Sequence, residues 1–155
     1  MRAVYRRDAY GVITSDESVR IRAAVVPHTN AGARHLGQRY WLAVARASRG
    51  LVRSRETDAG VELRVLGGPS ALRLATPQTA AGADGVRCCY AIEGGLLAHR
   101  AGGSLTLCEN AIRLRAVVAG FVPRLSSRAY QRLHHRLHVS VSRRFFTALL
   151  TEAST

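Results

Sequence analysis

Three histidines near the C-terminus, His134, His135 and His138, form the densest group of residues that could do chemistry. His134 and His138 are four positions apart, a spacing that places two imidazoles on one side of a helix and can bind Zn²⁺. We expect no metal site, because no third ligand accompanies them and Arg132 and Arg136 repel a cation. The sequence favours histidines at the surface or at a cavity edge, with a general acid or base at a pocket mouth as the alternative.

Arginine is the second chemical signal. The chain has 23 basic residues, all of them arginine, and 10 acidic residues, so its formal net charge is +13. The shortage of Asp and Glu suggests an anionic partner, a nucleic acid or a membrane surface, and the guanidinium fork suits phosphate. No helix-turn-helix, zinc finger or aromatic RNA-binding pattern is present, so a solvated basic surface is the alternative interpretation. The candidate anion-binding residues are Arg20, Arg22, Arg113, Arg115, Arg128, Arg132 and Arg136.

The sequence contains no motif of a glycosidase, a hydrolase or a nucleotide-binding enzyme. The acidic residues are scattered, and Glu93, beside a glycine corner, is interpreted as a rim charge paired with an arginine. The G-x-S-x-G, G-x-G-x-x-G and P-loop patterns are absent, so hydrolase and nucleotide-binding functions have no motif. Cys88, Cys89 and Cys108 form neither a disulfide framework nor a zinc motif. We therefore expect no cofactor and reduced thiols.

Neither targeting nor membrane insertion is expected from the sequence. The first 16 residues contain no apolar run long enough for the core of a secretory signal. The most apolar stretch, Ala116 to Val122, is far shorter than the 18 or so residues that a spanning helix needs. The sequence predicts a soluble, cytoplasmic protein whose oligomeric state stays open.

The 155 residues suit one domain, 1–155, whose elements must position these side chains. Alternation of apolar and charged residues predicts a first strand over 19–26. A helix is expected over 31–48, capped by Thr29 or Asn30, because Leu36, Tyr40 and Val44 recur at helical spacing. Residues 1–16 either add an edge strand or remain mobile.

The second half of the chain is predicted to be mostly strands. A hairpin is expected over 51–56 and 61–66, followed by a strand around 72–74, a loop over 76–85 and strands over 86–92, 104–108 and 110–118. A long amphipathic helix is expected over 126–150, because its apolar residues follow three- and four-residue steps. The predicted fold is α+β: an antiparallel sheet of six to seven strands packed on this helix, with one helix after the first strand.

Two strands carry nearly the same sequence pattern. Residues 19–23 read Val-Arg-Ile-Arg-Ala, and residues 112–116 read Ile-Arg-Leu-Arg-Ala. In a sheet, both segments direct their aliphatic residues to the core and Arg20, Arg22, Arg113 and Arg115 outward. Were the two strands neighbours, these like charges would be unfavourable, and a bound anion would relieve the repulsion.

This order of elements over residues 18–150 resembles the helix-grip fold of the START-like (SRPBCC) superfamily, which includes polyketide cyclase-like proteins. The resemblance implies that the sheet wraps the C-terminal helix and that the first strand lies beside the last. It also implies a cavity for an apolar or aromatic ligand. Residues 40–53 and 90–103 further resemble an uncharacterised family of GC-rich bacteria, which carries no activity with it.

Three hypotheses follow. The first is a protein that binds an apolar or aromatic small molecule between sheet and helix, and this function does not require catalysis. If the protein is an enzyme, the resemblance implies proton transfer of the cyclase or dehydratase type. The candidate catalytic residues are then His134 and Tyr130. The candidate ligand-binding residues are Tyr90, Ile92, Leu107, Leu114, Tyr130, Leu133, His134, Leu137 and Val141. The second is a basic module that binds nucleic acid or another polyanion through outward arginines. The third is a scaffold for a protein partner whose cavity is filled by its own Leu, Phe and Tyr side chains.

Overall fold

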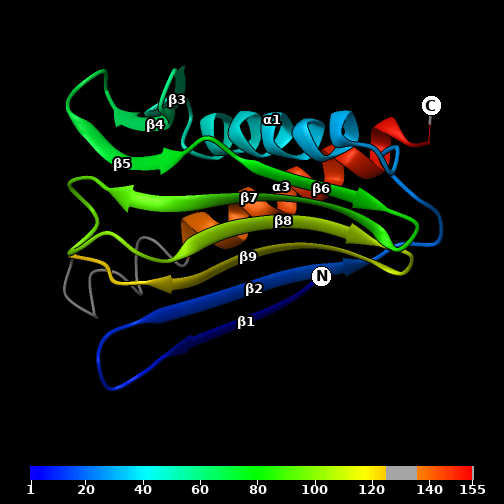
Figure 1. The fold of residues 1–155 in the computed structure, drawn as a ribbon, viewed down its shortest axis with the longest axis horizontal. Coiled ribbons are helices and arrows are strands. Elements are labelled where there is room, and N and C mark those ends of the chain that lie inside the picture. Colours follow the sequence, from blue (N-terminus) through cyan, green and yellow to red (C-terminus); the bar gives the residue numbers. More distant parts are fainter. Residues whose placement is uncertain (125–135, 155) are drawn as a thin grey trace.

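The computed structural model describes residues 1–124 and 136–154. Within these residues, helices pack against an antiparallel sheet, so the predicted α+β class is confirmed (Figure 1). The helices are α1 (Asn30–Ala47) and α3 (Arg136–Glu152). The strands are β1 (Arg2–Arg7), β2 (Ile13–Arg20), β3 (Val52–Thr57), β4 (Gly60–Val65), β5 (Ser70–Ala75), β6 (Gln78–Gly82), β7 (Gly85–Gly94), β8 (Ser104–Asn110) and β9 (Arg113–Phe121).

The described sheet has nine strands, so the predicted number of six to seven was wrong. Two segments account for the difference. The N-terminal segment, residues 1–16, contributes β1, and the predicted loop over 76–85 contains β6, which pairs with β7. Strand β6 escapes prediction because its sequence, Gln-Thr-Ala-Ala-Gly, lacks the large residues that mark a strand.

The strands follow the order β1-β2-β9-β8-β7-β5-β4-β3, which places β1 and β3 at the two edges. Strand β2 lies beside β9, although almost a hundred residues separate them in the sequence. The two segments of similar sequence therefore meet, with Val19 opposite Leu114 and Arg20 opposite Arg113. Their like charges lie side by side on one face of the sheet.

The predicted first strand, over 19–26, was placed too late in the chain. Strand β2 begins at Ile13 and ends at Arg20, and residues 21–29 form the connection to α1. Ile112 likewise lies in the turn before β9 and is 62% exposed, so it does not share the buried face of Leu114. In both segments, the alternation of apolar and charged residues extends beyond the residues that pair in the sheet.

Helix α1 agrees with its predicted range. The Thr29 hydroxyl accepts a hydrogen bond from the Gly32 amide at 3.2 Å, so Thr29 is the N-cap. Leu36, Tyr40 and Val44 are buried, as their spacing predicts. After the C-terminus of α1, Gly50 adopts a left-handed φ of 79°. This conformation ends a helix, and glycine adopts it readily because it has no Cβ.

Helix α3 is the described part of the helix expected over 126–150, and residues 126–135 of that range lie outside the described residues. The buried face of α3 includes Val141, Phe145 and Leu149 of the predicted stripe. The rings of Tyr40 and Phe145 pack edge to face with centroids 5.5 Å apart, which joins the two helices. Both helices belong to one packed core with the inner face of the sheet.

Gly37 lets α1 approach β7 closely. A Cβ at this position would lie 2.1 Å from the Tyr90 hydroxyl oxygen and 3.4 Å from the Cys88 sulfur. The Tyr90 hydroxyl in turn accepts a hydrogen bond from the Trp41 indole N–H at 3.2 Å. The missing side chain therefore sets the distance between helix and sheet.

Gly37→Ala is expected to lower the free energy of unfolding by about 1 to 3 kcal/mol, because the new methyl overlaps the Tyr90 hydroxyl in a packed core. Urea denaturation followed by circular dichroism measures this. Gly82→Ala, where a Cβ meets nothing within 4 Å, is the control and should stay within about 0.5 kcal/mol of the parent. Equal effects of the two substitutions would contradict the proposed close contact.

Candidate functional site

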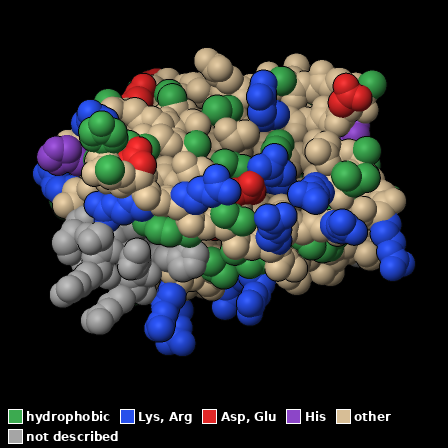
Figure 2. Space-filling view, turned by 90° about the horizontal axis from the view of Figure 1, so that it is seen from below, with side chains coloured by type: hydrophobic (Ala, Val, Ile, Leu, Met, Phe, Trp, Pro, Cys, Tyr) green, Lys and Arg blue, Asp and Glu red, His purple; other side chains and the backbone are tan. Residues whose placement is uncertain are grey.

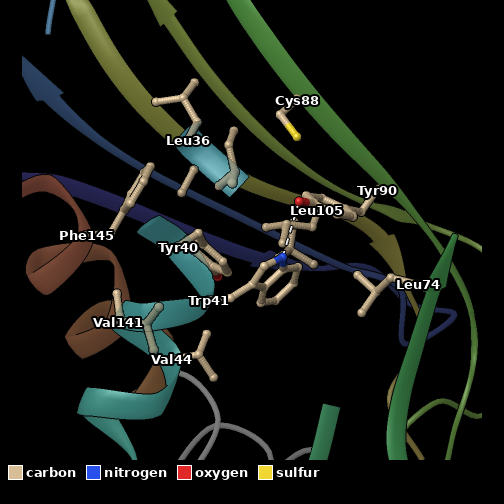
Figure 3. Packing of buried hydrophobic residues seen from close by; sticks show 14 of the residues in the cluster. Leu36, Tyr40, Trp41, Val44, Leu74, Cys88, Tyr90, Leu105, Val141 and Phe145 are labelled. Carbon is tan, nitrogen blue, oxygen red and sulfur yellow. Dashed lines mark hydrogen bonds between the residues drawn. The ribbon is translucent and has the colours of Figure 1, made fainter. Parts of the chain in front are cut away.

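An apolar cavity of about 120 Å³ lies between the two helices and the sheet. Helix α1 contributes Tyr40, Trp41 and Val44 to its wall, and α3 contributes Leu137, His138 and Val141. The sheet and the segment after β7 contribute aliphatic side chains: Val52, Leu63, Val65, Ala71, Leu72, Leu74, Ile92, Leu97 and Leu105. In Figure 3, Val44 and Val141 approach each other from the two helices, with Trp41 nearby.

The aromatic part of the wall is held rigidly. The ring of Trp41 packs edge to face against Tyr40, with centroids 5.3 Å apart, and against Tyr90, with centroids 5.1 Å apart. Because the Trp41 N–H is bonded to Tyr90, the indole presents its hydrocarbon to the cavity without leaving a buried donor unsatisfied (Figure 3). An aromatic surface prepared in this way is suited to a flat apolar ligand.

His138 places an imidazole in this apolar wall. Its Nδ1 lies 3.2 Å from Oε2 of Glu17 on β2, and both side chains are buried. The other carboxylate oxygen of Glu17, Oε1, accepts a hydrogen bond from the Ser15 hydroxyl at 2.5 Å. A strand and a helix far apart in the sequence thus fix the orientation of one ring at the cavity.

Two further polar side chains lie close to this pair. Burial raises the pKa of Tyr40, and the negative charge of Glu17 raises it further, so Tyr40 keeps its phenolic proton at neutral pH. Ser142 is fully buried one helical turn after His138. The cluster formed by Ser15, Glu17, Tyr40, His138 and Ser142 is therefore a polar island within an apolar core.

This combination has defined chemical capacities. The aliphatic and aromatic wall can bind an apolar molecule, since burial of apolar surface is the main driving force for such binding. An imidazole beside a carboxylate can accept or donate a proton, and the carboxylate sets the ring's orientation. The geometry can therefore bind an apolar ligand and offer it one group capable of proton transfer.

A second buried carboxylate, Glu109 on β8, has a structural role. Its oxygens accept hydrogen bonds from the backbone N–H groups of Val25 and Val26 at 3.2 Å, and His28 Nε2 lies 3.2 Å away. These contacts attach the connection between β2 and α1 to the centre of the sheet. Glu109 does not line the cavity, and its acceptor capacity is used by the backbone.

Of the described ligand candidates, Ile92, Leu137 and Val141 line the cavity, and their role in binding a ligand stays a prediction. Tyr90 does not line the cavity; its hydroxyl accepts the hydrogen bond from Trp41, and its side chain borders a separate polar pocket. Leu107 and Leu114 are fully buried in the core and do not line the cavity. Tyr130, Leu133 and His134, among them both candidate catalytic residues, lie outside the described residues.

Sequence reasoning missed the polar cluster. His138 was considered with His134 and His135 as a metal ligand, as a surface or cavity-edge histidine, or as a general acid or base, but its contact with Glu17 was not foreseen. A signal was present in β2, whose inward positions 13, 15, 17 and 19 read Ile, Ser, Glu and Val. Ser15 and Glu17 interrupt an otherwise apolar face, and such a pattern indicates polar side chains that are buried together with hydrogen-bonding partners.

The candidate anion-binding residues divide into three groups. Arg20, Arg113 and Arg115 lie on the sheet face opposite the helices. Arg22 lies in the connection after β2, so its predicted place on that face was wrong, and Arg136 begins α3 on the helix side. Arg128 and Arg132 lie outside the described residues.

Comparisons of the chain with protein-family models, curated proteins and solved structures find no match. In residues 1–124 and 136–154, no three His, Cys, Asp or Glu side chains are grouped so that they could hold a metal ion. The two described helices are too short or too polar to cross a membrane.

Glu17→Leu is expected to lower the free energy of unfolding by about 3 to 5 kcal/mol, because it removes the buried partner of His138. The double variant Glu17→Leu/His138→Leu should lose clearly less than the sum of the two single losses, since a matched apolar pair leaves no buried charge. Urea denaturation of the parent and the three variants measures the coupling. Additive losses would mean that the two side chains do not interact.

Proposed function

We propose that the protein binds a small apolar or aromatic molecule in the cavity between α1, α3 and the sheet. The observation that carries this proposal is the composition of the wall, whose described residues are aliphatic and aromatic apart from His138. An apolar concave site with few polar groups is the usual form of a small-molecule site.

The cavity volume limits the ligand. Pockets for drug-sized molecules measure roughly 300 to 1,000 Å³, whereas this cavity measures about 120 Å³. A dry cavity of about 150 Å³ lined by Leu, Ile and Phe is enough to bind benzene. The proposed ligand is therefore a single aromatic ring or a short aliphatic chain.

The arrangement of elements supports the same proposal. Strand β2 lies beside β9, α1 follows β2, and α3 ends the chain against the inner face of the sheet. A helix that follows a strand paired with the last strand is one feature that a resemblance to the helix-grip START-like proteins implies, and such proteins hold ligands between sheet and helix. A relationship to the START-like proteins is therefore proposed together with the ligand site.

Catalysis is not required by this proposal. If the ligand is transformed, the structure favours His138 over the other described residues as the group that exchanges a proton with it, because His138 combines contact with the cavity and a carboxylate partner. Proton transfer of the cyclase or dehydratase type needs no cofactor. The three cysteines are free, which is compatible with the proposed cytoplasmic location.

Benzene and phenol, each a single aromatic ring, are expected to bind to the purified protein and to shift the NMR signals of residues around the cavity. Val44→Phe should abolish these shifts, because the added ring atoms occupy the cavity. Leu42→Phe, on the exposed side of the same helix, is the matched control and should bind like the parent. Two-dimensional ¹H–¹⁵N spectra recorded during titration measure this.

The filled scaffold is the competing function. If neither probe shifts the spectrum and native mass spectrometry detects no bound small molecule, the cavity is a packing defect and the ligand proposal fails. If the probes bind equally well to the parent and to Val44→Phe, they bind elsewhere, and the proposal fails for this cavity.

A further inference from the structure

The sheet face opposite the helices carries most of the arginines of strands β1, β2, β7 and β9. Because alternate residues of a strand point to opposite faces, the burial of Ser15 and Glu17 on β2 and of Leu114 and Ala116 on β9 fixes which residues face outward. We call this the outer face. Its arginines are Arg2, Arg6, Arg20, Arg87, Arg113 and Arg115.

The register brings these arginines together. Ser18 of β2 lies opposite both Arg2 and Arg115, and Cys108 of β8 lies opposite both Arg115 and Arg87. Arg2, Arg115 and Arg87 therefore lie in one row across β1, β2, β9, β8 and β7, a width of about 19 Å at roughly 4.8 Å between strands. Arg20 and Arg113 face each other in the next row.

Little negative charge balances this face. Asp16 lies among the arginines and binds one of them, with its Oδ2 2.6 Å from the Arg115 Nη2. Glu93 is at the far end of β7. Within residues 1–124 and 136–154, the other five outer-face arginines form no ion pair. Figure 2, which looks toward the β1 edge of the sheet, shows many arginine side chains and few acidic ones on that side of the molecule.

The outer face also has a hollow suited to an anion. It measures about 260 Å³ and is lined by Arg2, Arg6 and Arg113 together with the hydroxyl residues Thr14 and Ser18, Asp16 and Val4. Guanidinium groups and hydroxyls are the groups that proteins use to bind phosphate oxygens. Like charges on adjacent strands are unfavourable alone and are relieved by a bound anion.

We propose that the outer face binds the sugar–phosphate backbone of double-stranded nucleic acid without reading its sequence. Single-strand binding proteins rely on aromatic residues for base stacking, and the described outer face offers none. A membrane surface is less suitable, because the valines of this face, Val4 and Val117, are half-buried and no large apolar side chain stands out from it. A duplex presents closely spaced phosphates, so several arginines in one row can neutralise several phosphates at once.

This inference is independent of the proposed ligand site. The cavity lies on the helix side of the sheet, and none of the outer-face arginines lines it. Failure of either proposal therefore leaves the other unaffected.

The test is fluorescence anisotropy of a labelled 20-base-pair DNA duplex at NaCl concentrations from 50 to 200 mM. The parent should bind with an affinity that falls steeply with salt, because each neutralised phosphate releases counterions. Arg20→Gln/Arg113→Gln should weaken binding and reduce the slope of log K against log [salt] by about 2. Asp16→Asn should tighten binding, since it removes the carboxylate that occupies Arg115.

Arg143→Gln/Arg144→Gln on the exposed side of α3 is the matched control, with the same loss of charge on the helix side. Its slope should equal that of the parent. Equal weakening by the two double variants would mean that net charge alone drives binding, and would overturn the proposal. So would absence of duplex binding at 50 mM NaCl, or preferential binding to phosphatidylglycerol vesicles.

Discussion

The contact between Glu17 and His138 is the interaction on which the rest of the described structure depends. It links the first half of the sheet to the C-terminal helix across more than a hundred residues of sequence. A buried carboxylate is unfavourable without polar partners, so Glu17 requires both Ser15 and His138 to be in place. On α3, the apolar residues Val141, Phe145 and Leu149 and the polar residue His138 are all buried, and the His138 ring lies 6.5 Å from the ring of Tyr40 at the cavity.

The two buried carboxylates illustrate two uses of the same group. Glu109 binds backbone N–H groups of a connecting segment, and its oxygens are thereby committed to holding the chain. Glu17 binds side chains, and one of these, His138, reaches a space large enough for a small molecule. A carboxylate bound to backbone amides stabilises a connection, whereas one bound to an imidazole can influence the chemistry of that imidazole.

The sequence predicted the elements whose patterns are strong and failed where packing overrides pattern. Helix α1 followed from the spacing of Leu36, Tyr40 and Val44, and the β3–β4 hairpin followed from alternation around a polar turn. Strand β6 is built from small residues, so only its pairing with β7 reveals it. Ile92, Leu137 and Val141, which were proposed from their apolar pattern, line the cavity. The contact between Glu17 and His138 could be seen only in the structure, because no local sequence pattern shows that a strand meets a distant helix.

Among the described residues, the order of the strands places β1 and β3 at the two ends of the sheet, and neither pairs with a further described strand on its outer side. Such edges invite strands from other molecules and are the usual starting points of fibre growth. Both edges are rich in arginine: β1 carries Arg2, Arg6 and Arg7, and β3 carries Arg53 and Arg55. If a second molecule paired its own edge strand with β1 or β3, the arginines of the two molecules would lie close together. Their electrostatic repulsion opposes the joining of sheets edge to edge.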